Sequence, residues 1–206
     1  MTTKKPDRRP PFILASGSPR RRKLLRGVVS SFQVVESGVP EPPPRKGTDV
    51  RVYVQRLARW KALAVARRIR FGLVLGADTV VVRRGEIFGK PQGRAEARRM
   101  LSDLSGKWHE VYTGLALAAR PGTRVWTAVA RTRVRMQEFS AAELGRLATR
   151  HHDKAGAYAA QARGNPFVQR YQGDFDNIVG LPRRTLRVLL GRARRAGFSL
   201  GAGSSG

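Results

Sequence analysis

The chain has 206 residues, 41% hydrophobic and 27% charged, and its 41 Lys and Arg against 14 Asp and Glu give a net charge of +27. This length suits one large α/β domain or two small lobes, and the composition excludes a wholly disordered chain. The absence of cysteine excludes disulfides, thiolate metal sites and cysteine nucleophiles. No apolar run approaches the roughly 18 residues of a membrane span, and no signal-peptide core follows the basic N-terminus, so we expect a cytoplasmic protein.

Positive charge is the most unusual property of the composition, since 33 of the 41 cations are Arg and only eight are Lys. A field of this sign attracts polyanions such as nucleic acids, anionic membranes and phosphate-rich small molecules. The Arg residues are dispersed along the whole chain, which favours an Arg-biased solvated surface over a dedicated nucleic-acid patch. We therefore expect non-specific attraction to nucleic acid and no membrane association.

Strand and helix patterns alternate between two polar chain ends. Residues 1–11 are expected to form a disordered basic arm and residues 199–206 a flexible Gly/Ser tail, which leaves residues 12–198 as a single domain. The expected strands are residues 12–15, 32–35, 73–82, 111–118 and 125–139, with one more near 167–171 inside a Gly-rich, irregular segment, 153–182. The expected helices are residues 49–69, 95–104 and 185–196, and two more that begin at Pro19 and after Ser140. This alternation predicts an α/β fold.

The segment from Ser16 to Arg21 joins the first strand to the first helix through a Gly/Ser loop. Ser18 is the expected N-cap and Pro19 the first helical residue. Cations such as Arg20 and Arg21 in a first helical turn oppose the helix dipole, and a bound anion would reverse that cost. Free backbone N–H groups, hydroxyls and guanidinium groups together predict a phosphate cradle, although an Arg-rich protein can also carry such a cluster without function.

Asp78 stands within an otherwise apolar strand that we expect to be interrupted at Gly76–Thr79. A buried carboxylate is costly unless it is paired, bound to a metal or placed at a strand end that faces a cleft. The position suits a general base or a metal ligand. The alternative is an Asp that caps a turn at the end of the strand.

Two acids and two lysines are candidate partners of Asp78. Either Glu36 or Glu41 could join it in a Mg²⁺ site, because such sites take one or two carboxylates plus phosphates and waters. Lys61, in an apolar helical stretch, and Lys90, in a tight Gly-Lys-Pro loop, are compatible with phosphate contacts and equally with surface positions. The adjacent histidines 151 and 152 are interpreted as solvated, since neighbouring side chains do not converge on one metal.

Six motifs occur in one order along residues 12–190 and carry a family resemblance. They are Ile13-Leu-Ala-Ser-Gly-Ser-Pro-Arg-Arg21, Gly76-Ala-Asp-Thr-Val80, Gly89-Lys-Pro91, Leu104-Ser-Gly106, Asp153-Lys-Ala-Gly-Ala-Tyr158 and Val179-Gly-Leu-Pro182. Together they resemble the Maf family of nucleoside triphosphate pyrophosphatases. The resemblance implies the fold shared with inosine triphosphate pyrophosphatases: a twisted mixed sheet flanked by helices, in two lobes with a central cleft. It also implies hydrolysis of a nucleoside triphosphate to the monophosphate and pyrophosphate, assisted by Mg²⁺ or Mn²⁺.

The same resemblance implies roles for individual residues. Asp78 matches the family's general base and also a metal ligand. The phosphate loop matches Ser16, Arg20 and Arg21, and the acid and lysines around the metal and phosphates match Glu41, Lys61 and Lys90. A triphosphate carries about four negative charges, so positioning and electrostatics would supply most of the catalysis.

Three positions distinguish branches of this family, and Arg20, Thr79 and Gln161 resemble the branch that acts on dTTP and UTP. A glutamine amide both donates and accepts, as the edge of uracil or thymine requires. The alternative is that Gln161 only holds its Gly-rich loop. Two other function classes stay open: a basic nucleic-acid-binding protein and a cell-division regulator, each on a Maf-like scaffold. A homodimer is a further expectation.

Overall fold

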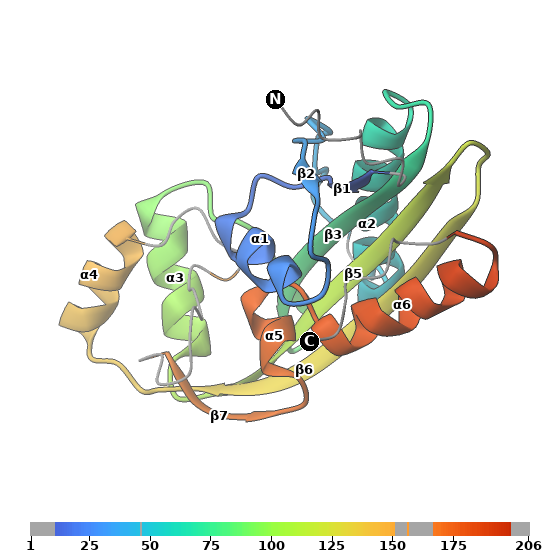
Figure 1. Ribbon diagram of the computed structural model, residues 1–206. Helices are drawn as coiled ribbons and strands as arrows, with labels where there is room; N and C mark the ends of the chain where they lie inside the picture. Colours follow the sequence, from blue (N-terminus) through green and yellow to red (C-terminus); the bar gives the residue numbers. More distant parts are fainter. Residues whose placement is uncertain (1–10, 46, 151–155, 157–166, 199–206) are drawn as a thin grey trace, which may run out of the picture.

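A seven-stranded mixed sheet organises the chain (Figure 1). The computed structural model describes residues 11–45, 47–150, 156 and 167–198. Its strands are β1 Phe12–Leu14, β2 Gln33–Val34, β3 Gly72–Arg83, β4 Glu86–Phe88, β5 Trp108–Arg120, β6 Val125–Met136 and β7 Val168–Gln172. Its helices are α1 Pro19–Arg26, α2 Val50–Ala66, α3 Arg94–Leu104, α4 Ala141–Arg150, α5 Phe175–Val179 and α6 Arg183–Arg195. No described helix is long and apolar enough to cross a membrane.

The strand order is β2-β1-β3-β5-β6-β7, and β4 pairs with β3. β1 lies parallel to both β2 and β3, while all other pairs are antiparallel. β1 pairs with β3 through Leu75, and β4 pairs with β3 from Val81 onward. Residues 76–80 of β3 lie between these two pairings, after the pairing with β1 ends and before the pairing with β4 begins.

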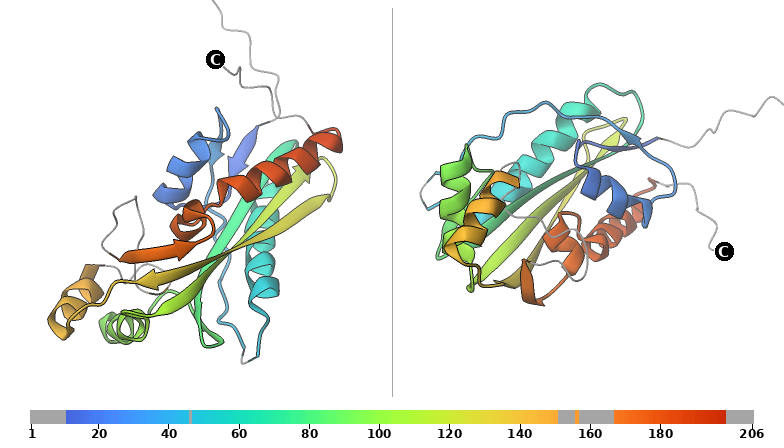
Figure 2. Two further views of the ribbon diagram at one scale, coloured as in Figure 1. Left: turned by 90° about the horizontal axis from the view of Figure 1, so that it is seen from below. Right: turned by 90° about the vertical axis from the view of Figure 1, so that its left-hand side faces the viewer.

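Helices cover both faces of the sheet (Figure 2). α2 packs on one face, where Ala58, Ala62 and Val65 contact Val74 of β3. α6 packs on the opposite face, where its leucines share a core with Leu73 and Leu75. This division follows from the strand period of two, because successive side chains of β3 point to opposite faces.

α3 and α4 form a second lobe at one end of the sheet, away from β1 and β2 (Figures 1 and 2). Its core combines Met100 and Leu101 of α3, Leu144 and Ala148 of α4 and Val134 of β6. The two-lobed α/β architecture expected from the sequence is therefore present, with the cleft described below between the lobes.

Local sequence signals account for several element boundaries. The Asp49 carboxylate accepts hydrogen bonds from the first-turn backbone N–H groups of α2, at 2.7 and 3.2 Å. Ser140 and Glu143 form the expected capping box before α4. Arg84 and Gly85 have φ of 50° and 78°, as a two-residue hairpin turn requires, and so connect β3 to β4.

The structure differs from the sequence-based expectation at three elements, β3, β4 and α5. β3 is continuous through Gly76–Thr79, so Asp78 lies in the middle of a strand and not at a strand end. β4 follows the expected turn, and α5 lies within the segment expected to be irregular. Residues 1–10 and 199–206, expected to be an arm and a tail, lie outside the described residues.

Candidate active site

A cleft of about 1200 Å³ lies between the two lobes. Its walls come from the loop between β1 and α1, the Pro-rich segment before α2, the middle of β3, and the Gly89-Lys90 loop. Every described residue to which the sequence assigned a candidate site role lines it: Ser16, Arg20, Arg21, Glu36, Glu41, Lys61, Asp78, Thr79 and Lys90.

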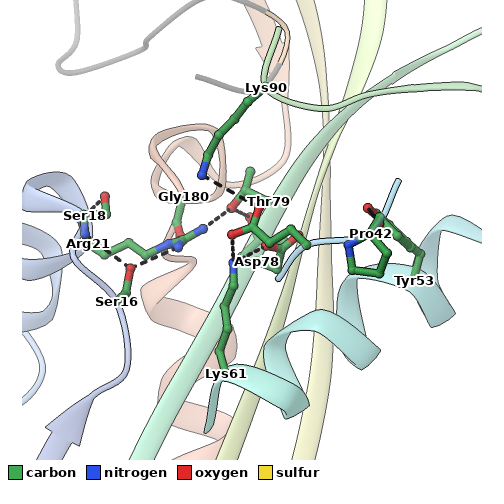
Figure 3. A network of polar contacts seen from close by, with 12 residues as sticks. Ser16, Ser18, Arg21, Pro42, Tyr53, Lys61, Asp78, Thr79, Lys90 and Gly180 are labelled. Carbon is green, nitrogen blue, oxygen red and sulfur yellow. Dashed lines mark hydrogen bonds and ion pairs between the residues drawn. The ribbon is translucent and has the colours of Figure 1, made fainter. Parts of the chain in front are cut away.

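Lys61 is the central cation of the cleft. Its Nζ lies 2.6 Å from Asp78 Oδ1 and 2.7 Å from Glu41 Oε1, and the residue is only 7% exposed (Figure 3). One ammonium group thus connects α2, β3 and the Pro-rich segment. Because an isolated buried charge is costly, both the lysine and Asp78 depend on this contact.

Gly76 permits that contact. It precedes Asp78 by two residues and therefore points to the same face of the sheet, toward α2. A Cβ at Gly76 would overlap the Ala58 carbonyl oxygen and lie 2.7 Å from the Ala62 backbone nitrogen. The glycine lets α2 approach the strand closely, and the Lys61 side chain then reaches Asp78.

The two carboxylates have opposite pKa shifts. Burial raises the pKa of Asp78, and the charges of Lys61 and Arg21 only partly oppose that effect. Burial also acts to raise the pKa of Glu41, but the Lys61 hydrogen bond and charge outweigh it, and the pKa is lowered. Burial therefore makes Asp78 a stronger base than an ordinary aspartate, whereas its cationic neighbours make Glu41 a weaker base than an ordinary glutamate.

Tyr53 and Lys90 hold Glu41, and the Pro-rich segment that carries it, from two sides. The Tyr53 hydroxyl of α2 donates to the Pro42 carbonyl at 2.9 Å. Lys90 Nζ lies 3.7 Å from Glu41 Oε2, from the opposite wall of the cleft. Glu36 instead lies against Gly17, where an added Cβ would overlap its carboxylate. Of the two acids considered from the sequence, Glu41 is the one that shares a cation with Asp78.

Arg21 occupies the other side of β3, opposite the Lys61 side. Its Nε donates to the Gly180 carbonyl at 2.9 Å, and its terminal nitrogens donate to Ser16 Oγ at 3.2 Å and Thr79 Oγ1 at 3.0 Å (Figure 3). Burial lowers the pKa of its guanidinium, and the negative charge of Asp78 opposes that shift. Ser18 caps α1, as expected, by accepting from the Arg21 backbone N–H at 3.4 Å.

The Maf-like protein family matches residues 11–193. The chain belongs to the Maf family. It is 42% identical to a Dictyoglomus thermophilum protein named dTTP/UTP pyrophosphatase, over 92% of this chain and 97% of the relative. Proteins of the same name from Hahella chejuensis and Bacillus cytotoxicus are 44% and 46% identical, over 87% and 83% of this chain and 90% and 89% of their own. The solved Staphylococcus aureus Ham1 protein aligns at a TM-score of 0.43 and 10% identity, over 62% of this chain and 72% of its own.

For this Maf protein, several interpretations from the sequence can now be compared with the geometry. The alternative of a turn-capping Asp78 is wrong, because the residue lies mid-strand and contacts Lys61. Lys61 is buried, so the surface alternative is wrong for it, whereas the Lys90 side chain is 62% exposed. Gln161 and the histidines 151 and 152 lie outside the described residues.

Sequence reasoning missed four residues that support the cleft: Tyr53, Thr113, Asn177 and Gly180. Tyr53 had no detectable signal, because it occupies an ordinary apolar position of α2. Gly180 belongs to the motif Val179-Gly-Leu-Pro182, whose position after a short helix was not recognised. Thr113 could have been found only with the β3–β5 register, since it stands directly opposite Thr79.

Proposed function

We propose that this Maf protein hydrolyses dTTP and UTP to the nucleoside monophosphate and pyrophosphate. The observation that supports this most strongly is the buried contact of Lys61 with both Asp78 and Glu41 inside a cleft that also holds Arg20, Arg21 and Lys90. Four cations around two carboxylates suit a substrate with about four negative charges and a reaction that needs a base. The names of relatives 42–46% identical to this chain support the choice of substrate.

Asp78 is the general base in this proposal. Its raised pKa makes it a better proton acceptor than an ordinary Asp, and Lys61 holds it by one oxygen, Oδ1. A water oxygen attacks the α-phosphorus, its proton passes to Asp78, and the bond from the α-phosphorus to the bridging oxygen breaks. Pyrophosphate leaves with the bonding electron pair, and the charges of Lys61 and Lys90 stabilise it.

Glu41 and Asp78 are the residues that would hold a divalent metal. Both carboxylates lie within 2.7 Å of one Lys61 nitrogen, so their oxygens converge on one region of the cleft. Mg²⁺ commonly binds one or two carboxylates and takes its other ligands from phosphates and water, so this donor set fits. The described residues contain no larger cluster of acids and histidines. When bound, Mg²⁺ or Mn²⁺ would neutralise phosphate charge.

Substrate choice is assigned to Arg20, Thr79 and Gln161. Arg20 and Thr79 both line the cleft on the Arg21 side of β3. Gln161 enters the proposal through the family resemblance alone.

The direct test is a product assay over dTTP, UTP, CTP, ATP and GTP, with EDTA, Mg²⁺ or Mn²⁺. We expect dTTP and UTP to be the fastest substrates, to yield monophosphate and pyrophosphate in equal amounts, and to require the metal. Release of the nucleoside diphosphate and inorganic phosphate would contradict the proposal. Equal rates on all five nucleotides would contradict it as well.

A further inference from the structure

Thr79 and Thr113 stand directly opposite each other in the β3–β5 pair, and their hydroxyl oxygens lie 2.9 Å apart. Thr113 is fully buried, whereas Thr79 also lines the cleft. A threonine hydroxyl has one hydrogen to donate and two lone pairs to accept. Where that one hydrogen points decides what Thr79 presents to a bound molecule.

Two fixed groups set the direction of this hydrogen-bond chain. At one end, the Arg21 guanidinium can only donate, and it donates to Thr79 Oγ1 at 3.0 Å. At the other end, the backbone carbonyl of Asn177 can only accept, and Thr113 Oγ1 lies 3.4 Å from its oxygen. All three hydrogen bonds form together only if Thr79 donates to Thr113 and Thr113 donates to Asn177. In the reverse direction the Thr113–Asn177 bond is lost.

α5 holds both ends of this hydrogen-bond chain in place. Its Asn177 carbonyl faces Thr113, and Gly180, directly after the helix, offers its carbonyl to Arg21 Nε at 2.9 Å. The Asn177 side chain anchors α5 to the sheet by donating to the Val111 carbonyl at 2.9 Å and to Thr132 Oγ1 at 3.0 Å. These bonds fix α5 against the sheet, and α5 in turn fixes the two ends of the hydrogen-bond chain.

We propose that Thr113 is a positioning residue that fixes Thr79 as a hydrogen-bond acceptor toward the cleft, so that the site selects the ring N3–H of uracil and thymine. With its hydrogen directed at Thr113 and one lone pair engaged by Arg21, Thr79 has a lone pair left to offer. Uracil and thymine carry an N–H at N3, whereas cytosine carries a lone pair there and would be repelled. This inference rests on the proposed function, because it assumes that a nucleotide base reaches Thr79.

The test compares kcat/KM for UTP and CTP in variants of Thr113. Thr113→Val removes the hydroxyl and frees the Thr79 hydrogen to point into the cleft, so the UTP-to-CTP ratio should fall about fivefold, the value of one hydrogen bond. Thr113→Ala, which adds no bulk, should lower the ratio in the same way if the Val variant does not fold. Thr113→Ser keeps the hydroxyl and should keep the wild-type ratio.

Thr127→Val is the control. Thr127 lies in β6, its hydroxyl oxygen is 3.5 Å from Gln55 Nε2, and the residue does not line the cleft. Its loss should act on UTP and CTP alike. If Thr113→Val and Thr113→Ala keep the wild-type ratio, or if Thr127→Val lowers it equally, Thr113 does not set the choice of base.

A second measurement separates this inference from the proposed function. Binding of the α,β-methylene analogues of UTP and CTP, measured by calorimetry, gives the ratio of the two affinities without turnover. Wild-type protein that binds the UTP analogue more tightly, with the preference lost in Thr113→Val, supports the inference even if no hydrolysis occurs. Hydrolysis of UTP with an affinity ratio that Thr113→Val leaves unchanged overturns the inference and leaves the proposed function intact.

Discussion

Lys61 Nζ lies 2.6 Å from Asp78 Oδ1, and the two side chains belong to different layers of the fold, a helix and the sheet that it covers. Glu41 adds a second carboxylate to the same nitrogen at 2.7 Å. Removal of one partner of a buried ion pair leaves an uncompensated charge, which is costly. The contact therefore ties the packing of α2 on β3 to the chemistry of the cleft, and the first three predictions follow from it.

Asp78→Asn should abolish most turnover and leave the fold intact. The amide cannot take a proton from water, and general-base catalysis contributes typically 10²–10⁴-fold. Its oxygen can still accept from Lys61, so the melting temperature should stay near that of wild type. Asp103→Asn, at an exposed acid on α3 that does not line the cleft, is the matched control and should keep full activity. A folded Asp78→Asn variant with wild-type kcat would show that another group is the base.

Tyr53→Phe should weaken catalysis by loosening the segment that carries Glu41. The variant loses only the 2.9 Å hydrogen bond to the Pro42 carbonyl, whose net value is about 1 kcal/mol. We expect kcat/KM to fall up to about fivefold, with a higher metal concentration for half-maximal rate. Tyr112→Phe, which loses a comparable bond to Glu110, should leave both quantities unchanged. Equal effects of the two substitutions would exclude a special role for Tyr53.

Gly76→Ala should lower stability and activity together. The new Cβ would overlap the backbone of α2, and such overpacking costs typically 1–3 kcal/mol. Relief requires α2 to move outward, which separates Lys61 from Asp78. Gly145→Ala in α4, where an added Cβ meets nothing within 4 Å, should be neutral or stabilising by about 1 kcal/mol. Denaturant unfolding and steady-state kinetics on both variants test this, and a stable, fully active Gly76→Ala would refute the packing argument.

His109 should make the fold sensitive to acid. Burial lowers its pKa to about 4, and the nearby charge of Arg83 adds to that effect. Between pH 6.5 and pH 4 the unfolded chain binds a proton at this residue and the folded chain does not, so stability is lost as the pH falls, by up to about 3 kcal/mol. Urea unfolding of wild type and His109→Leu across this range should show a shallower pH dependence for the variant. Parallel curves would mean that His109 does not contribute.

Much of the fold and of the cleft could be predicted from the sequence, because the decisive signals are local. An acid in an apolar strand, Asp78, and a lysine in an apolar helical stretch, Lys61, both violate the usual pattern of burial, and the structure pairs them. The first helix was likewise evident from Ser18 and Pro19.

The remaining features depend on contacts between distant parts of the chain. α5 has five residues and β4 has three, too few for an apolar period to be detected. Tyr53 and Thr113 act through bonds to residues 11 and 34 positions away, Pro42 and Thr79, and no local pattern encodes such partners. The continuity of β3 through Gly76 was hidden because a glycine in a strand usually indicates a break. Here the missing side chain instead lets α2 pack closely against the strand.

The central claim, that Asp78 activates a water for attack on the α-phosphorus, is tested most directly by hydrolysis of UTP in H₂¹⁸O with mass spectrometry of both products. Attack at the α-phosphorus places the label in UMP and leaves pyrophosphate unlabelled, and this is the result that we predict for wild type, with labelled UMP lost in Asp78→Asn. Label in pyrophosphate would place the attack at the β-phosphorus and contradict the account.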